Sequence, residues 1–385
     1  MSTPQPSPAP NPSPAPPLWN APPVARAGGG VFAAIGIIIA GIVGLLVIAY
    51  LVAGLGVSTL VIGSVLALVP LTIVLLAVRW VDRWEPEPRW ALWFAFLWGA
   101  GVSVAIALIV DLGVQLALAF AEPGVGPDAV LQAVVQAPIV EETAKGVGVL
   151  LIYAFSRSHF DGPVDGLVYA ATVAAGFAFT ENVLYFGVAL AEGGTAELGA
   201  TFVLRGLFSP FAHVLFTVCV GLAVGIGARR GGGAGVIGWF LLGLVCAALL
   251  HALWNGSLTF ATDAIGLYFT VQVPIFIGAV LITWFLRREE IRVTRTRLAE
   301  YGAAGWFSPA EVEMLATPSG RRQAIAWART RTPPRTALMR KLITDATHLA
   351  FTRHRLVTGR AGGRAATDEH ALLAAVMADR AALLG

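Results

Sequence analysis

The sequence is poor in cysteine and in charge. It has two cysteines, Cys219 and Cys246, and both lie inside apolar runs. This excludes a disulfide framework and a cysteine-based zinc site, because either needs paired or clustered thiols. Charged residues make up 13% of the chain and hydrophobic residues 57%. Such a composition is typical of a chain that lies mostly in lipid, so we expect a polytopic membrane protein.

Several familiar catalytic motifs are also missing. The sequence has no His-Glu-x-x-His signature, and no Gly-x-Ser-x-Gly elbow or Walker motif in a suitable context. These absences exclude the soluble metalloprotease geometry and give no support to a serine hydrolase or a nucleotide-binding site. Lysine is rare as well, occurring only at Lys145 and Lys341, so a lysine inside an apolar run stands out.

Long apolar runs define the predicted spans. At about 20 apolar residues for each membrane-spanning helix, we predict an all-α fold, a polytopic membrane helix bundle of about eight transmembrane helices. The spans run near Val31 to Ala53, Ser58 to Val78, Trp90 to Phe120, Ala129 to Phe155, Val164 to Leu190, Ala200 to Ala228, Val236 to Ala261 and Ile265 to Leu286. The third is overlong and carries Asp111, so we expect it to tilt, bend or extend past the membrane.

The chain divides into three parts. Residues 1–29 are a Pro/Ala-rich leader that we expect to be disordered and cytoplasmic, and residues 30–286 form the transmembrane domain. Residues 287–385 form an Arg-rich, small helical cytoplasmic domain, in which Ser308 predicts a helix N-cap followed by Pro309 and Glu311. Arginines in such a domain are typical of a solvated face near anionic lipid, and we expect no nucleic-acid partner.

Arginine occurs in alternate loops between the predicted spans. The loops after the second, fourth, sixth and eighth spans carry arginine, whereas the intervening loops, such as Ala191 to Gly199, carry neither lysine nor arginine. This alternation predicts a multi-pass protein of the plasma membrane with both termini cytoplasmic. Arg205, near the outer end of the sixth span, is the exception. We expect it to snorkel to the interface or to pair within the bundle.

The fourth predicted span carries three charges in the middle of an apolar run. On a helix, Lys145 lies four residues after Glu141 and three after Glu142, so it shares a face with both and can pair with either. Ionisable groups near a bilayer midplane are costly and are functional candidates by default. The alternative is a buried ion pair that only fixes helix packing.

The next three spans bring further polar groups to a similar depth. The fifth carries Glu181 and Asn182, the sixth His213, and the seventh His251 and Asn255 on one face. A lone histidine on an apolar face is usually a satisfied core residue. Together, however, these groups are the types that hold a divalent metal or activate water. We predict that His213, His251 and Glu181 either ligate a metal, with Zn²⁺ as the candidate ion, or stabilise the oxyanion.

Four motifs in this order resemble those of a known family. Glu141-Glu142-x-x-Lys145, Phe177-x-x-x-Glu181-Asn182, the single His213 and His251-x-x-Trp254-Asn255 are similar to motifs of the PrsW family of intramembrane proteases. That family is related to the CAAX-prenyl endopeptidases and bacteriocin-immunity proteases. The Asp82-Arg83-Trp84-Glu85-Pro86-Glu87-Pro88 stretch is also similar to a feature of the family. The resemblance covers roughly residues 79–256, the motif core of the transmembrane protease domain.

The resemblance implies an intramembrane endopeptidase that cuts membrane-bound protein substrates, such as an anti-sigma factor in stress signalling. It implies catalytic roles for Glu141, Glu142 and His213, with Glu141 favoured as general base. We expect the orienting residues to be Lys145, Asn182 and Asn255. The sequence leaves open whether a metal is bound or whether glutamate and histidine activate water directly.

Two other functions account for the same residues. A proton- or cation-coupled membrane transporter would use the carboxylates and histidines as a relay, although no internal repeat favours it. A catalytically silent scaffold would recruit partners through the Arg-rich domain. The oligomeric state is also open, because Gly221-x-x-x-Gly225 predicts close packing of two helices either within the bundle or between two copies.

Overall fold

The computed structural model describes residues 29–121, 126–157, 160, 162–230, 233, 235–359 and 365–384. Nearly all of the predicted N-terminal leader lies outside these residues. The described residues fold into helices joined by short connections and contain no strand, which confirms the all-α prediction.

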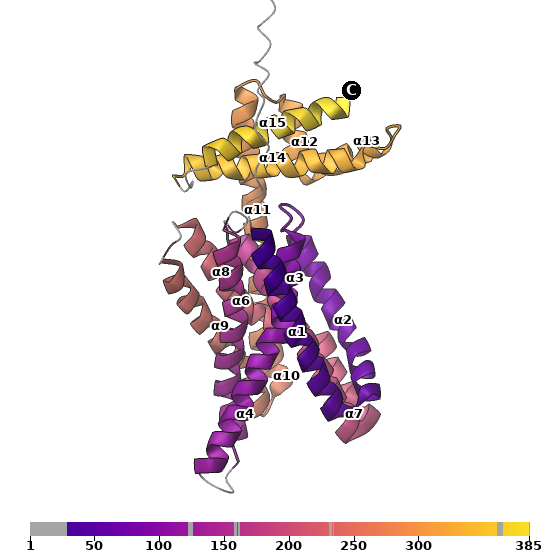
Figure 1. The fold of residues 1–385 in the computed structure, drawn as a ribbon, viewed down its shortest axis with the longest axis vertical. Coiled ribbons are helices and arrows are strands. Elements are labelled where there is room, and N and C mark those ends of the chain that lie inside the picture. The colour runs from indigo at the N-terminus through magenta and orange to yellow at the C-terminus, as the bar shows by residue number, and fades with distance from the viewer. Residues whose placement is uncertain are drawn as a thin grey trace, which may run out of the picture.

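The membrane part is a bundle of long apolar helices (Figure 1). Among the described residues, four short segments of it, η1 to η4, are π-helical. Its elements are α1 (Gly29–Leu55), α2 (Val57–Val81), α3 (Arg89–Leu97), η1 (Trp98–Ser103), α4 (Val104–Ala121), α5 (Ala129–Leu131), η2 (Gln132–Gln136), α6 (Ala137–Phe155), α7 (Pro163–Phe202), η3 (Val203–Phe208), α8 (Ala212–Arg229), α9 (Gly235–Phe260), α10 (Ala264–Leu267), η4 (Tyr268–Gln272) and α11 (Val273–Ala303). Each of the eight predicted ranges is therefore largely helical.

The number of spans depends on how the helices are counted. By length and composition, 6 helical stretches of the described residues are able to cross a membrane. One of them, Pro163–Arg229, covers both the fifth and the sixth predicted spans. The fourth predicted span is helical but is not among the 6, because α6 carries three charged residues. A polytopic bundle is confirmed, whereas the figure of eight remains a prediction.

The prediction of a loop between the fifth and sixth spans is wrong. Residues 191–199 are helical and belong to α7, which continues to Phe202. The helix is broken only at Gly194, whose φ of 66° and ψ of −155° lie outside the helical region. A positive φ suits glycine because it has no Cβ to clash with the backbone. The segment lacks proline, so a single glycine kinks the helix where the sequence suggested a loop.

Helix α7 forms the centre of the bundle, with Tyr169 and Val173 fully buried in its main core. Glycines allow α8 to pack closely on it. A Cβ at Gly221 would lie 2.0 Å from the carbonyl oxygen of Gly166, and one at Gly225 would lie 2.3 Å from that of Gly162. No side chain fits in that space. Of the two alternatives for the Gly-x-x-x-Gly motif, the structure therefore shows packing within the bundle.

The C-terminal domain lies at one end of the bundle and is connected to it by α11 (Figure 1). Its remaining helices are α12 (Pro309–Ala316), α13 (Pro318–Arg329), α14 (Thr336–Val357) and α15 (Ala365–Leu384). Leu298, Leu315 and Leu349 belong to its separate hydrophobic core. The predicted cap is confirmed, since the Ser308 hydroxyl accepts from the Glu311 N–H in a capping box. Helix α11 runs continuously through the predicted domain boundary at residue 287.

The loop between α2 and α3 joins the two parts of the molecule. The Arg321 guanidinium of α13 lies 3.4 Å from the centre of the Trp84 ring, and its Nη1 donates to the Trp84 carbonyl over 2.9 Å. The Trp84 indole N–H donates to the Thr294 hydroxyl of α11 over 3.1 Å. Cation–π contact and two hydrogen bonds therefore fix this loop against the C-terminal domain.

Candidate active site

Two glutamates and a lysine on α6 form a buried ion-pair cluster. The helix starts beside Pro138, where the π-helical turn η2 ends. The Lys145 ammonium lies 3.2 Å from the Glu141 carboxylate and 2.8 Å from that of Glu142. The side chains of Lys145 and Glu142 are 0% exposed and that of Glu141 is 11% exposed. The lysine thus pairs with both glutamates, as the helical spacing predicts.

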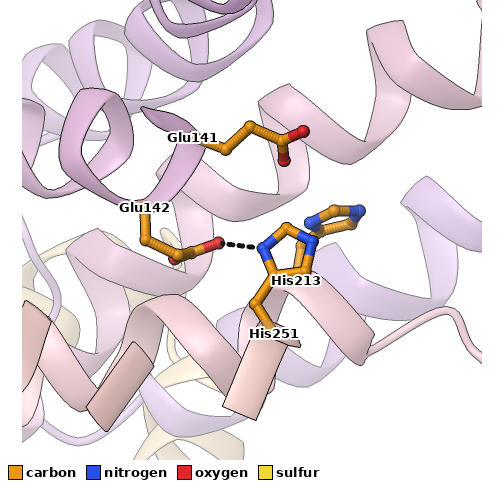
Figure 2. Close-up of side chains that lie close together, drawn as sticks. All are labelled: Glu141, Glu142, His213 and His251. Atoms are coloured by element: carbon orange, nitrogen blue, oxygen red, sulfur yellow. Dashed lines mark hydrogen bonds and ion pairs between the residues drawn. The ribbon is translucent and has the colours of Figure 1, made fainter. Parts of the chain in front are cut away.

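Two histidines from other helices lie beside these glutamates (Figure 2). His213 belongs to the first turn of α8, just after a break in helical geometry at Ser209 (φ −126°, ψ 34°). His251 comes from α9, and its Nδ1 lies 3.1 Å from Glu142 Oε1. The two imidazole rings are 5.3 Å apart between centroids. Sequence positions more than 100 residues apart therefore meet at one point.

Glu141 and Glu142 differ in how many hydrogen-bond and ion-pair partners their carboxylates have. Glu142 accepts from Lys145 and contacts His251 through Oε1, and it accepts from the Thr217 hydroxyl over 2.8 Å through Oε2. Among the described residues, Glu141 has a single ion pair, with Lys145. Glu141 also lines a cavity of about 240 Å³. Glu142 is therefore held in place, whereas Glu141 has acceptor capacity to spare.

The Lys145 ammonium sits at the centre of the cluster. Besides the two glutamates, it lies 3.2 Å from His213 Nδ1 and 3.8 Å from the centre of the Phe177 ring. An ammonium has three N–H groups and no acceptor, so these three polar partners use all of its donors. It follows that His213 Nδ1 accepts, and that Nε2 carries the ring proton.

A second ion pair lies on the other side of His213. The His213 Nε2 is 2.7 Å from Glu181 Oε2, and the same oxygen pairs with Arg205. The Arg205 Nε donates to Asn182 Oδ1 over 2.9 Å, and its guanidinium lies 4.0 Å from the centre of the Tyr185 ring. Of the two alternatives for this arginine, the structure shows pairing within the bundle. Its five donors let one side chain orient Glu181 and Asn182 together.

The donor groups fit a divalent metal in kind and nearly in spacing. One ligand atom from each of Glu141, Glu142, His213 and His251 lies within 4.8 Å of the others. In a tetrahedral zinc site, ligands about 2.0–2.2 Å from the ion lie about 3.3–3.6 Å apart, so the most widely spaced of these atoms would have to move closer by about 1 Å. Lys145 contacts three of the four groups, so an ion would compete with its ammonium.

Glu181, a predicted ligand, is not one of these four groups in the part of the chain that the structure describes. Its carboxylate is instead shared between Arg205 and His213. Asn255, a predicted orienting residue, donates to the Ala133 carbonyl over 2.8 Å. It therefore ties α9 to η2, the segment that leads into α6.

Two residues that contact the cluster were not predicted from the sequence. Phe177 was seen only as the start of a motif, yet its ring lies against the Lys145 ammonium. Thr217, which binds Glu142, lies four residues after His213 on α8. That spacing puts both side chains on one helical face and could have identified the threonine.

The chain matches known proteins over the region that contains this site. A family model described as "PrsW family intramembrane metalloprotease" matches residues 87–279, half of the chain. Protease PrsW of Geobacillus kaustophilus is 33% identical over 144 residues, which are 37% of this chain and 57% of that protein. Protease PrsW of Bacillus subtilis is 33% identical over 146 residues, 38% and 59% of the two chains. No solved structure is significantly similar to the chain.

The match to these relatives is partial, since the chain spans somewhat over half of their length. The match to the family model includes all four polar motifs of the bundle, from Glu141 to Asn255. The comparisons support a membrane protease and give no support to the transporter alternative. With the apolar helices of the bundle, they establish a membrane protein. The chain belongs to the PrsW family of intramembrane metalloproteases.

Proposed function

We propose that the protein is an intramembrane endopeptidase that hydrolyses a peptide bond of a membrane-bound protein. One observation carries this proposal. Glu141, Glu142, His213 and His251 bring their donor atoms within 4.8 Å of one another inside an apolar bundle. Carboxylates and imidazoles gathered in such a setting are the groups that activate water and transfer its proton.

Glu141 acts as the general base in this proposal. Glu141 lines the cavity and its carboxylate carries one ion pair, so the carboxylate has acceptor capacity for a hydrogen bond from water. It takes the proton of the attacking water and passes it to the leaving amine. Glu142 is the next candidate for this role. Its full set of partners suits it better to holding Lys145 and His251 in position.

The negative charge that develops on the scissile carbonyl oxygen needs nearby donors. The Lys145 ammonium, which pairs with Glu141, supplies positive charge beside that oxygen and would donate to it by releasing one of its three partners, such as His213 Nδ1. Preorganised donors of this kind stabilise a transition state by about 3–4 kcal/mol each. Arg205 and Glu181 support His213 from behind, because Glu181 accepts from its Nε2.

The ligand set that the geometry favours for a metal is Glu142, His213 and His251, with Glu142 in place of the predicted Glu181. A divalent ion such as Zn²⁺ held there would polarise the carbonyl and lower the pKa of a bound water. Glu141 would remain beside it as the base.

The same proposal extends to location and substrate. We place the protein in the plasma membrane with both termini cytoplasmic, because arginine follows the alternate-loop pattern and the loop bearing Arg83 contacts the C-terminal domain through Trp84. The substrate is a membrane protein, with an anti-sigma factor as the type that the family resemblance suggests.

The test is cleavage of a panel of single-span membrane proteins by purified protein in liposomes. Wild type is compared with Glu141→Gln and with Glu192→Gln, an exposed glutamate on α7 that serves as the matched control. We expect cleavage by wild type and the control and none by Glu141→Gln. Loss in chelator with recovery in zinc would assign a metal. Retained cleavage in Glu141→Gln would remove this residue from the mechanism.

A further inference from the structure

A cavity of about 240 Å³ extends from the glutamates between α1, α4, η2 and α7. Glu141 and Glu181 line it, and so do Leu51, Asp111 and Gln136. A single water needs only about 10–15 Å³ in such a measure, so this space holds far more than one catalytic water. It connects the candidate base to a polar group that the mechanism does not use.

That polar group is centred on Asp111 in the middle of α4. Its Oδ1 accepts from the Gln132 amide, and the Gln136 amide lies 3.4 Å from the same oxygen. Its Oδ2 accepts from Gln115 over 2.8 Å. A carboxylate in a membrane span is costly and is retained where it has a role. Gln132 and Gln136 lie on η2, and π-helical turns occur often at functional sites.

Hydrolysis inside a bilayer requires such groups. In a helical substrate each carbonyl is bonded to an N–H four residues on, so the scissile bond becomes accessible only when the helix unwinds. Unwinding leaves N–H and C=O groups without partners, and lipid supplies none. A glutamine side chain offers two donors and an acceptor, which can replace the lost backbone bonds. The long contact of Gln136 with Asp111 leaves its amide the least committed of the three.

We propose that this cavity binds an unwound, extended stretch of the substrate's membrane segment. The substrate backbone exchanges hydrogen bonds with Gln136 and Gln132, and its apolar side chains pack on residues such as Leu51 and Leu184. The stretch then leads along η2 to Glu141, five residues beyond Gln136 on the same chain. This inference rests on the proposed protease function, whose substrate-binding groove it identifies.

A second cavity is less suited to this role, although it is larger at about 320 Å³. Neither Glu141 nor Glu181 is among the described residues that line this cavity. Two of its polar side chains are already bonded, since Tyr268 donates to the Phe208 carbonyl over 2.8 Å and Gln272 donates to Ser257 over 2.6 Å. An unwound backbone would find few free partners there.

The first experiment tests the groove without requiring cleavage. Cysteine is placed at Ala107, which lines the cavity, or at Ile109, which is 68% exposed on α4, in a Cys219→Ala/Cys246→Ala background. The two positions lie about 200° apart around the helix. In the Glu141→Gln variant we expect a charged, water-soluble thiol reagent to label Ala107→Cys at least tenfold faster than Ile109→Cys. Equal rates would overturn the proposal, because the cavity would then not admit water.

The second experiment adds a synthetic probe to the same labelled variants. A single-span Leu/Ala peptide with a central Gly-Pro pair, which unwinds locally, should slow labelling of Ala107→Cys at least fivefold. The same peptide without the Gly-Pro pair should not. Equal protection by both peptides, or by neither, would overturn the proposal that the cavity binds extended chain. Protection by the first peptide without cleavage of any substrate by wild type would support the groove while removing the proposed protease function.

The third experiment substitutes the amide itself. Gln136→Leu should remove most of the protection by the Gly-Pro peptide, so that the peptide slows labelling less than twofold, and on a cleaved substrate it should raise KM with a smaller change in kcat. Gln115→Leu is the matched control, because this glutamine binds the same Asp111 but does not line the cavity. Equal effects of the two substitutions would show that only the Asp111 network matters and would overturn the role of Gln136.

Discussion

Lys145 donates to Glu142 across 2.8 Å, and neither side chain has any exposure to solvent. Burial of these two charges is tolerated because they form an ion pair with each other. Their remaining hydrogen bonds are made with His213, His251 and Thr217. A buried pair of this kind adds little net stability, yet removing one partner leaves an uncompensated charge. The first prediction follows from that asymmetry.

Lys145→Met should destabilise the protein by about 3–5 kcal/mol, since it leaves two glutamates without their cation. The chain provides its own control in Lys341, the other lysine, which is 55% exposed and pairs with Asp345 and Asp379. Lys341→Met should cost less than about 1 kcal/mol. Thermal unfolding in detergent micelles measures both. Similar midpoints for the two variants would contradict the central position of Lys145.

Glu141→Gln and Glu142→Gln should separate activity from stability. Glu141 has one ion pair, so we expect Glu141→Gln to abolish cleavage with a stability loss below about 1 kcal/mol. Glu142 has three partners, so Glu142→Gln should abolish cleavage and also lose about 2 kcal/mol or more. The measurements are cleavage in liposomes and the thermal midpoint. Equal destabilisation would mean that Glu141 also has a packing role.

Metal content should distinguish the two possible carboxylate ligands. We expect Glu142→Gln and His251→Ala to lower bound zinc at least tenfold, because both residues belong to the four-group cluster. Glu181→Gln should leave zinc content within about twofold, since its carboxylate pairs with Arg205 and His213. Elemental analysis of protein dialysed against zinc gives the answer. Loss of zinc in Glu181→Gln but not in Glu142→Gln would instead support the ligands predicted from sequence, His213, His251 and Glu181.

Arg205→Lys should reduce cleavage although it keeps the charge. A lysine ammonium cannot contact Glu181 and Asn182 in the forked geometry of a guanidinium, so His213 would lose its fixed acceptor. We expect a fall in kcat of about tenfold to a hundredfold, or about 1.4–2.7 kcal/mol. Arg230→Lys, at an arginine that stacks on Trp239, is the control. An unchanged pH profile with full activity would show that Arg205 has no part in orienting the site.

Stability should fall as pH rises from about 4 to about 7. Burial raises the pKa of Asp82 from 3.8 to about 7, against the opposing effects of the Glu87 backbone N–H and Arg79. The folded protein therefore retains a proton that the unfolded chain releases near pH 4, and this contribution is lost as pH approaches 7. One pKa unit corresponds to about 1.4 kcal/mol.

Asp82→Asn should flatten this dependence, because the amide stays neutral and its oxygen can still accept from the Glu87 N–H. Thermal midpoints at pH 5 and pH 8 give the comparison. Burial also raises the pKa of Glu87 well above its usual range, so we expect a residual slope from that residue. If the change of stability with pH were the same in Asp82→Asn as in wild type, the effect would have to come from groups other than Asp82.

Periodicity and charge spacing predicted much of this molecule. The pairing of Lys145 with both glutamates follows from positions three and four on one helix, and the Ser308 cap follows from residue type at short range. Local signals of this kind need no knowledge of the fold. The helical ranges were predicted for the same reason.

Contacts between distant segments were not predictable in the same way. The four-group cluster contains Glu142 and not Glu181, and which carboxylate lies nearest the histidines depends on how α6 and α7 pack, which no single-sequence pattern fixes. The break at Gly194 likewise replaced an expected loop, because two adjacent glycines are compatible with a turn or a kink. The cavity beside Asp111 arises only when α1, α4, η2 and α7 pack together.

The contact of Trp84 with Arg321 has a consequence for engineering this protein. The Asp82–Pro88 stretch resembles a family motif of the membrane part, yet its indole is 4% exposed and is covered by α11 and α13. A chimera that joins this bundle to a foreign tail would expose a large aromatic ring and leave its N–H without an acceptor. Exchange of the tail between relatives therefore requires the loop, α13 and the part of α11 that carries Thr294 to be transplanted together.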